Sequence, residues 1–253
     1  MKQDSSEYKK KKAFFDSIIT LYGRNVVLEV LQDENVEVHK LHMSNSNQND
    51  GAIKSILSLA KKRDIDITYH EKKALSRISK NAKQDQGVAI DIIAKSYKNV
   101  DEIKNLDTFK LIALDGIQNP QNLGMIIRSC AAGDVDGIIL PTKSSAKISP
   151  LVIKASAGTL FKLPIYYCNT LDKILSELNE LQNTKIYALS SHATCSIYDI
   201  KKSDKSIYVL GNESDGVSKE IDELCNDSIS IPMKRGVESL NVAVTASLLA
   251  FMG

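Results

Sequence analysis

From Phe109 onward, short uninterrupted apolar runs alternate with segments that have helical apolar spacing. The apolar runs are "FKLIALD" (109–115), 136–141, 163–168, 185–190, 206–211 and "SISIP" (228–232). The helical patterns that separate most of them lie at 123–133, within 142–158, and at 171–182, 217–225 and 239–251. Strands that are apolar on both faces and alternate with helices are typical of a parallel sheet covered by helices on both sides. The pattern therefore predicts an α/β domain over 109–253, with ligands at the carboxyl ends of its strands.

A second, smaller α/β unit is predicted over residues 17–95. Its expected helices are 17–31, 52–64 and 71–80, and its expected strands are 36–44, 65–70 and 87–95. Residues 1–16 look like a charged N-terminal arm, and residues 96–108 carry few large apolar side chains, so we expect them to be a linker.

The formal net charge of the 253-residue chain is only +2, but its distribution is uneven. Residues 1–107 hold 19 basic and 16 acidic side chains, a balance of +3, whereas residues 108–253 hold 14 and 15, a balance of −1. Basic clusters at Lys9–Lys12, Lys61–Arg63 and Lys72-Lys73 suit a phosphate backbone. Each cluster is equally typical of a solvated tail or helix face.

Several classes of protein are disfavoured. The four cysteines are far apart and form no C-x-x-C pair, which argues against a zinc site and a disulfide framework. No apolar run approaches the ~20 residues of a membrane span. The first residues lack the apolar core of a secretory signal. We therefore expect a cytoplasmic protein with no metal and no membrane association.

The loop after the first strand, 115–122, leads into a helix that carries Asn122 and Arg128. Arg128 follows Asn122 by six residues, almost two helical turns, so we expect both side chains to project from nearly the same side. Arg128 interrupts an apolar run, and a guanidinium there needs a carboxylate or a phosphate as its partner. A helix N-cap and a surface arginine are the ordinary alternatives.

The loop after strand 206–211, "VLGNESDGV", places two glycines around Glu213. It matches neither a P-loop nor a dinucleotide fingerprint, but glycines after a strand let a backbone approach a ligand closely. The loop after strand 228–232 ends in "ESLN", with Ser239 and Asn241 at the mouth of the last helix. Either loop alone is typical of a turn or a helix cap. Polar side chains at three strand ends of one sheet indicate a site.

These three stretches together resemble the three motifs of the SpoU (TrmH-type) RNA 2′-O-ribose methyltransferases, in the family's order. "LDGIQNPQNLGMIIRSC" is similar to N-x-G-x-x-x-R, "VLGNESDGV" to G-x-E-x-x-G, and "IPMKRGVESLNVAVTAS" to I-P-M…S-L-N. The resemblance covers roughly 109–253 and is closest to the subgroup that methylates guanosine in large-subunit ribosomal RNA. Through "YGRNVVLEVL" and "QGVAIDI", the smaller unit is similar to the family's ribosomal-protein-L30e-like substrate-binding domain.

The resemblance implies a SPOUT α/β-knot fold, in which the C-terminal segment forms a deep trefoil knot, and S-adenosylmethionine as the methyl donor. Carried over by position, the expected donor-binding residues are Leu210, Gly211, Ile231, Met233 and Leu240. The expected active-site residues are Asn122, Arg128, Glu213, Ser239 and Asn241. No metal is needed, because the sulfonium leaves as a neutral thioether. Arg128 stands where the family has its proposed base, and the safer role for it is to orient an RNA phosphate and stabilise developing charge.

The implied function is methyl transfer to a ribose 2′-hydroxyl, of a guanosine in 23S ribosomal RNA, by a homodimer formed through the knotted domain. Two alternatives stay open: a tRNA 2′-O-ribose methyltransferase, and a non-catalytic RNA-binding protein that keeps the fold. The substrate-binding domain favours ribosomal RNA over tRNA.

Overall fold

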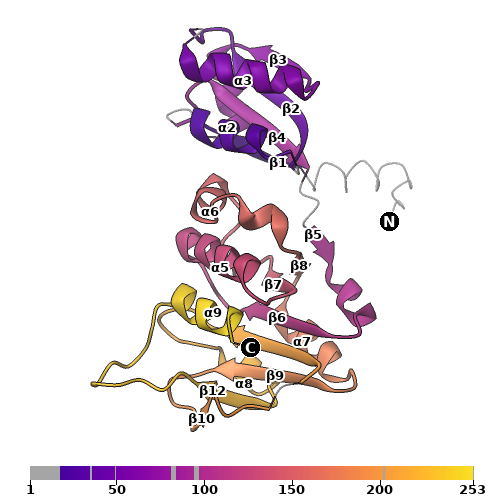
Figure 1. Cartoon of the computed structure of the whole chain (residues 1–253), viewed down its shortest axis with the longest axis vertical. Helices are drawn as coiled ribbons and strands as arrows, with labels where there is room; N and C mark the ends of the chain where they lie inside the picture. Colours follow the sequence, from indigo (N-terminus) through magenta and orange to yellow (C-terminus); the bar gives the residue numbers. More distant parts are fainter. Residues whose placement is uncertain are drawn as a thin grey trace, which may run out of the picture. The chain divides into compact units, whose positions relative to one another are not determined.

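The chain divides into two compact units, Met1–Lys95 and Ser96–Gly253, as seen in the computed structural model (Figure 1). The structure describes residues 18–34, 36–48, 50–80, 84–93, 97–201 and 203–252. The predicted arm, 1–16, lies outside these residues.

The first unit is built on a four-stranded sheet with the order β1-β4-β2-β3. β4 pairs antiparallel with β1 and β2, and β3 pairs parallel with β2. The strands are β1 (Ile18–Tyr22), β2 (Glu37–Ser44), β3 (Ile67–His70) and β4 (Val88–Ile93). The helices are α2 (Arg24–Gln32), α3 (Gly51–Lys62) and α4 (Lys72–Ser79). The predicted alternation of helices and strands is present from residue 36 onward.

The start of this unit differs from the prediction of one helix over 17–31. Residues Ile18–Tyr22 form β1, and the helix begins only at Arg24. The break is at Gly23, whose φ of 93° is a conformation that glycine adopts without strain. The Gly23 amide then donates to the carbonyl of Val88, which joins β1 to β4. Because the run "IITLY" is β-branched and aromatic, it suits the sheet better than a helix.

The second unit contains an eight-stranded sheet with the order β10-β12-β9-β11-β6-β7-β8-β5, in which every adjacent pair is parallel. Its strands are β5 (Tyr97–Asn99), β6 (Phe109–Leu114), β7 (Gly137–Pro141), β8 (Ile165–Cys168), β9 (Thr184–Leu189), β10 (Cys195–Ser196), β11 (Lys205–Leu210) and β12 (Asp227–Ser230). Its α-helices are α5 (Pro120–Ala132), α6 (Pro150–Ala155), α7 (Leu171–Asn179), α8 (Lys219–Asp222) and α9 (Val242–Ala250). The predicted parallel α/β sheet is confirmed.

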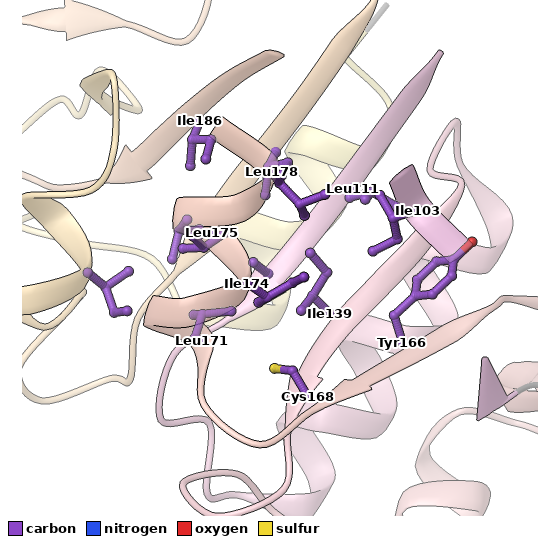
Figure 2. Close-up of a cluster of buried hydrophobic side chains, with 14 of the residues drawn as sticks. Ile103, Leu111, Ile139, Tyr166, Cys168, Leu171, Ile174, Leu175, Leu178 and Ile186 are labelled. Carbon is purple, nitrogen blue, oxygen red and sulfur yellow. The ribbon is translucent and has the colours of Figure 1, made fainter. Parts of the chain in front are cut away.

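Helices cover both faces of this sheet. On one face, Leu175 and Leu178 of α7 pack with Leu111 of β6 and Ile139 of β7 in a buried cluster (Figure 2). On the other face, α5 packs between α6 and α9. Gly124 allows the close approach of α6, because an added Cβ would lie 2.6 Å from the carbonyl oxygen of Val152. These contacts fix α5, which begins at the carboxyl end of β6.

The predicted linker, 96–108, is partly structured. Tyr97–Asn99 form β5, which pairs with β8, and Val100–Asn105 form a 3-10 helix, η1. Ile103 of η1 is fully buried in the cluster of Figure 2. Val100 and Leu106 also pack against this cluster, so the segment belongs to the second unit in spite of its polar composition.

Among the residues that the structure describes, no helix is long and apolar enough to cross a membrane.

Candidate active site

The three polar loops start at the carboxyl ends of β6, β11 and β12. β6 and β11 are direct neighbours, and β9 separates β11 from β12. The first two loops are joined where the strands end: the Asp115 amide donates to the Leu210 carbonyl at 2.8 Å, and the Ser218 amide donates to Asp115 Oδ2 at 2.8 Å. The topology therefore gathers the predicted loops at one edge of the sheet, as the sequence pattern indicates.

The second loop is a tight, rigid turn. Asn212 and Gly216 exchange two backbone hydrogen bonds of 3.1 Å each, and Asn212 Oδ1 accepts from the amides of Ser214 and Asp215. Gly216 has a φ of 72°, which favours glycine. At the start of the turn, an added Cβ on Gly211 would overlap the backbone of Gly216. The turn thus holds Glu213 at its tip.

A hydrogen-bonded chain connects three of the predicted residues. Asn122 Nδ2 donates to Glu213 Oε1, and Asn241 Nδ2 donates to Asn122 Oδ1 at 3.3 Å. Asn122 is only 8% exposed, so its amide needs these partners. Asn241 also caps α9, because its Oδ1 accepts from the Ala243 amide at 2.9 Å. We call Asn122, Glu213 and Asn241 the amide–carboxylate chain.

Asn119, rather than Asn122, caps the N-terminus of α5. Its Oδ1 accepts from the amides of Gln121 and Asn122, and Pro120 occupies the first helical position. This frees the Asn122 side chain to face the site. An asparagine followed by proline is a strong N-cap signal, and it would have found Asn119 in the sequence.

Arg128 lies apart from this chain, and the prediction that it projects from nearly the same side of α5 as Asn122 is wrong. Six residues turn a helix by about 600°, which leaves the two side chains about 120° apart. Asn122 is buried, whereas Arg128 is exposed, on the same stripe as Met125. Within the described part of the chain, Arg128 has no hydrogen bond or ion pair, so the partner expected for its guanidinium is not supplied there.

The remaining predicted residues lie at the strand ends or in the long loop before α9. Leu210 ends β11 and is buried, Gly211 follows it, and Ile231 follows β12. Residues 231–241 have no helix or strand, and Figure 1 shows this loop reaching away from the sheet before it returns to α9. Met233 is half-buried in this loop; Leu240 and Ser239 are exposed there. Among the described residues, no hydrogen bond joins Ser239 to the amide–carboxylate chain.

Three of the four cysteines are unsuited to act as nucleophiles. All four cysteines are free thiols. Burial raises the pKa of Cys130 and of Cys225 to about 12, and it raises the pKa of Cys168 to about 11. These thiols are therefore protonated at neutral pH and are poor nucleophiles. Among the described residues, no group of three or more His, Cys, Asp or Glu side chains is arranged to hold a metal ion.

Basic side chains lie on elements that pack against α5. The net charge of −1 summed over residues 108–253 did not reveal them. Residues 137–171 contain four lysines and no acidic residue. The four, Lys143, Lys147, Lys154 and Lys162, are all exposed, and none forms an ion pair within the described chain. They lie on and around α6 and the 3-10 helix η2 (Thr159–Lys162), both of which pack against α5. We call these four residues the lysine surface.

In the first unit, the basic clusters have unequal roles. Arg63 has a structural role at the end of α2. Its Nη1 donates to the carbonyls of Val30 and Leu31 in the last turn of α2, and to that of Asp33 just after the helix, at 3.1 Å each. Lys62 pairs with Glu34. Arg63 is therefore committed to the fold of the unit, whereas Lys61 and Lys62 stay exposed, and Lys9–Lys12 lie outside the described residues.

Comparison with known proteins covers both units. The family model described as "SpoU rRNA Methylase family" matches residues 110–251, and the model described as "RNA 2'-O ribose methyltransferase substrate binding" matches residues 20–98. A putative TrmH family tRNA/rRNA methyltransferase of Bacillus subtilis, YacO, is 31% identical over 238 residues, covering 90% of this chain and 92% of its own length. An uncharacterized tRNA/rRNA methyltransferase of Mycobacterium ulcerans is 30% identical, covering 92% and 76%.

Solved structures share the fold at lower identity. The SpoU methyltransferase AviRb from Streptomyces viridochromogenes, in complex with the cofactor AdoMet, matches with a TM-score of 0.73 at 19% identity, covering 98% of this chain and 91% of its own. An AdoMet-bound rRNA methyltransferase from Sinorhizobium meliloti matches with a TM-score of 0.68 at 22% identity, covering 95% and 88%.

Proposed function

Because this chain belongs to the SpoU rRNA methylase family, we propose that it transfers the methyl group of S-adenosylmethionine to a ribose 2′-hydroxyl of ribosomal RNA. A guanosine of 23S ribosomal RNA is the expected target. The ribose as acceptor is supported by the family model over residues 20–98, whose description names 2′-O ribose methylation. We further propose that this first unit binds the RNA substrate.

The observation that carries the proposal is the amide–carboxylate chain. It joins the loop after β6, the turn after β11 and the start of α9 at the carboxyl edge of one sheet. In the amide–carboxylate chain, Glu213 accepts only through Oε1. Within the described residues, its Oε2 is therefore left to accept another hydrogen bond. We assign that bond to the ribose hydroxyl, which would meet groups already held in place.

The residues at the same edge fit a methyl donor with an adenosine group. Gly211 lets the turn after β11 fold back tightly against the strand end, and Ile231, Met233 and Leu240 offer partly exposed apolar side chains. These residues, together with Leu210, would hold S-adenosylmethionine. When bound, this cofactor supplies an electrophilic methyl group.

Arg128 is assigned to the RNA phosphate beside the target ribose. A guanidinium binds phosphate through paired charge-assisted hydrogen bonds, and Arg128 is exposed with no competing partner in the described chain. An arginine stays protonated at neutral pH, so its contribution is to hold the backbone and to stabilise charge that develops during transfer. Ser239 is proposed as a further polar active-site residue at the carboxyl edge of the sheet.

The lysine surface supports RNA as the partner of the second unit as well. Four exposed lysines without a neighbouring carboxylate attract a phosphate backbone. The helix and 3-10 helix that carry or adjoin them pack against α5, the helix of Arg128. RNA that lies across these lysines would therefore pass close to the helix that carries Arg128.

A homodimer through the second unit is proposed from the composition of α9. This helix, "VAVTASLLA", has no charged residue, although one side of it faces solvent. Its exposed stripe consists of Val244 and Leu248 and continues to Phe251, which is 65% exposed. Met125 of α5 is exposed beside it, and α5 packs against α9. A helix that is apolar all round is normally covered, and a second copy of the same face would cover it.

Replacing Leu248 with glutamate should convert the dimer to a monomer, because it places a charge in the centre of the proposed apolar contact. Sedimentation velocity at micromolar concentration measures the change. The matched control is Tyr198→Glu, which adds the same charge to another exposed side chain of this unit, in the loop after β10. A wild-type monomer, or a dimer that survives Leu248→Glu, would contradict the assignment of this interface.

The function is tested by incubating the full chain with methyl-labelled S-adenosylmethionine and unmodified 23S ribosomal RNA, followed by digestion to nucleosides and mass spectrometry. We expect label in 2′-O-methylguanosine. Label on a base would contradict ribose methylation. Label found only in a parallel tRNA sample would identify tRNA, and not ribosomal RNA, as the substrate. Binding of donor and RNA without transfer would favour the non-catalytic alternative.

A further inference from the structure

The first unit contains a cavity of about 550 Å³ that no part of the proposed reaction uses. It lies where the β1–α2 turn, the end of β2, the start of α4 and the residues before β4 meet. The walls are tied together: the Arg24 amide donates to Gln86 Oε1 at 3.0 Å, Asn47 Nδ2 donates to the Gly87 carbonyl at 2.7 Å, and the Ser44 amide donates to the same carbonyl at 2.9 Å. The cavity is therefore a fixed feature of the unit.

The charges around the cavity favour an anion. Asp85 is the one carboxylate in its lining, and it is turned into the protein: it is 3% exposed, and its oxygens accept from Ser76, Ser79 and the Gly87 amide. Lys72, in contrast, is exposed and has no hydrogen bond or ion pair from its ammonium group within the described residues. Lys72 is therefore a cation of the lining whose charge is left to pair with an anion.

The rest of the lining is rich in groups that form hydrogen bonds. All eight lining residues are polar, charged or glycine. Pockets for free small molecules are mostly apolar, so this lining argues against one. Asn47 Nδ2 and Gln86 Oε1 are engaged in the wall, so Asn47 Oδ1 is left to accept from a nucleobase edge and Gln86 Nε2 to donate to one. Arg24 is held by Asp50 and by the Gln86 carbonyl, so its guanidinium is fixed at the wall.

We propose that this cavity binds one unpaired nucleotide of the RNA substrate, with its phosphate at Lys72 and its base edge at Gln86 and Asn47. The volume accommodates a single nucleotide and lies within the usual range for ligand sites. Proteins read RNA mainly at single-stranded positions whose bases are turned outward. The inference rests on the proposed function, since it names the position at which the first unit grips the RNA.

Two substitutions test the cavity, each with a matched control. Lys72→Gln removes the unpaired cation, and its control Lys73→Gln removes the same charge from the next residue, which is exposed and does not line the cavity. Gln86→Glu keeps the acceptor for the Arg24 amide but adds a negative charge at the opening. Its control, Gln32→Glu, adds that charge at the far end of α2.

With unmodified 23S ribosomal RNA as the probe, we expect Lys72→Gln and Gln86→Glu each to raise the RNA Kd and KM roughly tenfold, the loss expected for a charge-assisted hydrogen bond. The turnover rate at saturating RNA and the affinity for S-adenosylmethionine should stay at wild-type values, and both controls should behave as wild type. Photo-crosslinks from RNA that contains 4-thiouridine should map to peptides bearing Asn47, Lys72 or Gln86.

The experiment distinguishes failure of the proposed methyl transfer from failure of the proposed nucleotide site. If the wild-type chain binds the RNA but transfers no methyl group, the proposed function fails, while the Kd comparison and the crosslinks still decide on the cavity. If the wild type is active and the cavity variants match their controls, the cavity proposal is overturned. Competition by free guanosine or adenosine monophosphate at micromolar concentration would also overturn it, because the site would then belong to a free nucleotide.

Discussion

Replacing Arg128 with alanine should reduce RNA methylation by at least about a hundredfold, the effect of removing a charged group that stabilises a transition state. The affinity for S-adenosylmethionine should stay within about twofold of wild type, because Arg128 lies outside the residues assigned to the donor. Isothermal titration with the donor and a methyl-transfer assay at saturating RNA measure the two effects. The matched control is Arg77→Ala, on the exposed side of α4, which should methylate normally.

A second experiment tests whether Arg128 acts in the site of its own chain or in that of a partner copy. Because Arg128 is exposed and about 120° around α5 from Asn122, we also test whether it serves the site of the partner copy in the proposed dimer. If Arg128→Ala is co-expressed with a donor-binding variant such as Gly211→Ala, mixed dimers would regain one working site. Half of the dimers would be mixed, which gives about a quarter of wild-type activity. If Arg128 serves its own chain, the mixture stays inactive. A collapse of donor affinity in Arg128→Ala would contradict its assigned role in either case.

Gly211→Ala should abolish methylation by preventing donor binding. The added methyl group would overlap the backbone of Gly216, so the turn that carries Glu213 has to open. Because backbone rather than a flexible side chain is in the way, we expect the donor Kd to rise by more than about tenfold, with overpacking costing about 1–3 kcal/mol. Circular dichroism and titration with S-adenosylmethionine separate unfolding from loss of binding.

The control for this variant is Gly216→Ala at the other end of the same turn. An added Cβ there meets no atom within 4 Å, so its cost is that of the positive φ alone, about 1–2 kcal/mol. Donor binding by Gly216→Ala should therefore be weakened less. Wild-type donor affinity in Gly211→Ala would show that the turn adapts and that Gly211 does not border the donor.

The parallel sheet and its polar edge were predictable, because strands such as Ile207–Leu210 are apolar on both faces and each loop follows directly from a strand. Asn122, Glu213 and Asn241 were found through motif resemblance, and the structure joins them. The prediction that failed concerned the angular position of a side chain around its helix. Arg128 was placed on the wrong side of α5, since six residues are not a whole number of turns.

Two other errors came from local composition. The run Ile18–Tyr22 fits helical spacing over a short window, but its β-branched and aromatic side chains and its pairing with β4 make it a strand. The polar segment 96–108 hides Ile103, whose burial draws the segment onto the sheet. The lysine surface was missed because charges were summed over half of the chain, whereas a window over 137–171 would have shown it.

The sequence separations within the amide–carboxylate chain have a consequence for the order of folding. Asn122 and Glu213 are 91 residues apart, and Asn122 and Asn241 are 119 apart. Contacts between such distant segments form slowly, because a long loop has to close before they yield any stabilisation. We therefore expect helices to form early during refolding from denaturant, and catalytic competence to emerge later, once β6 has paired with β11 and the final helix has docked.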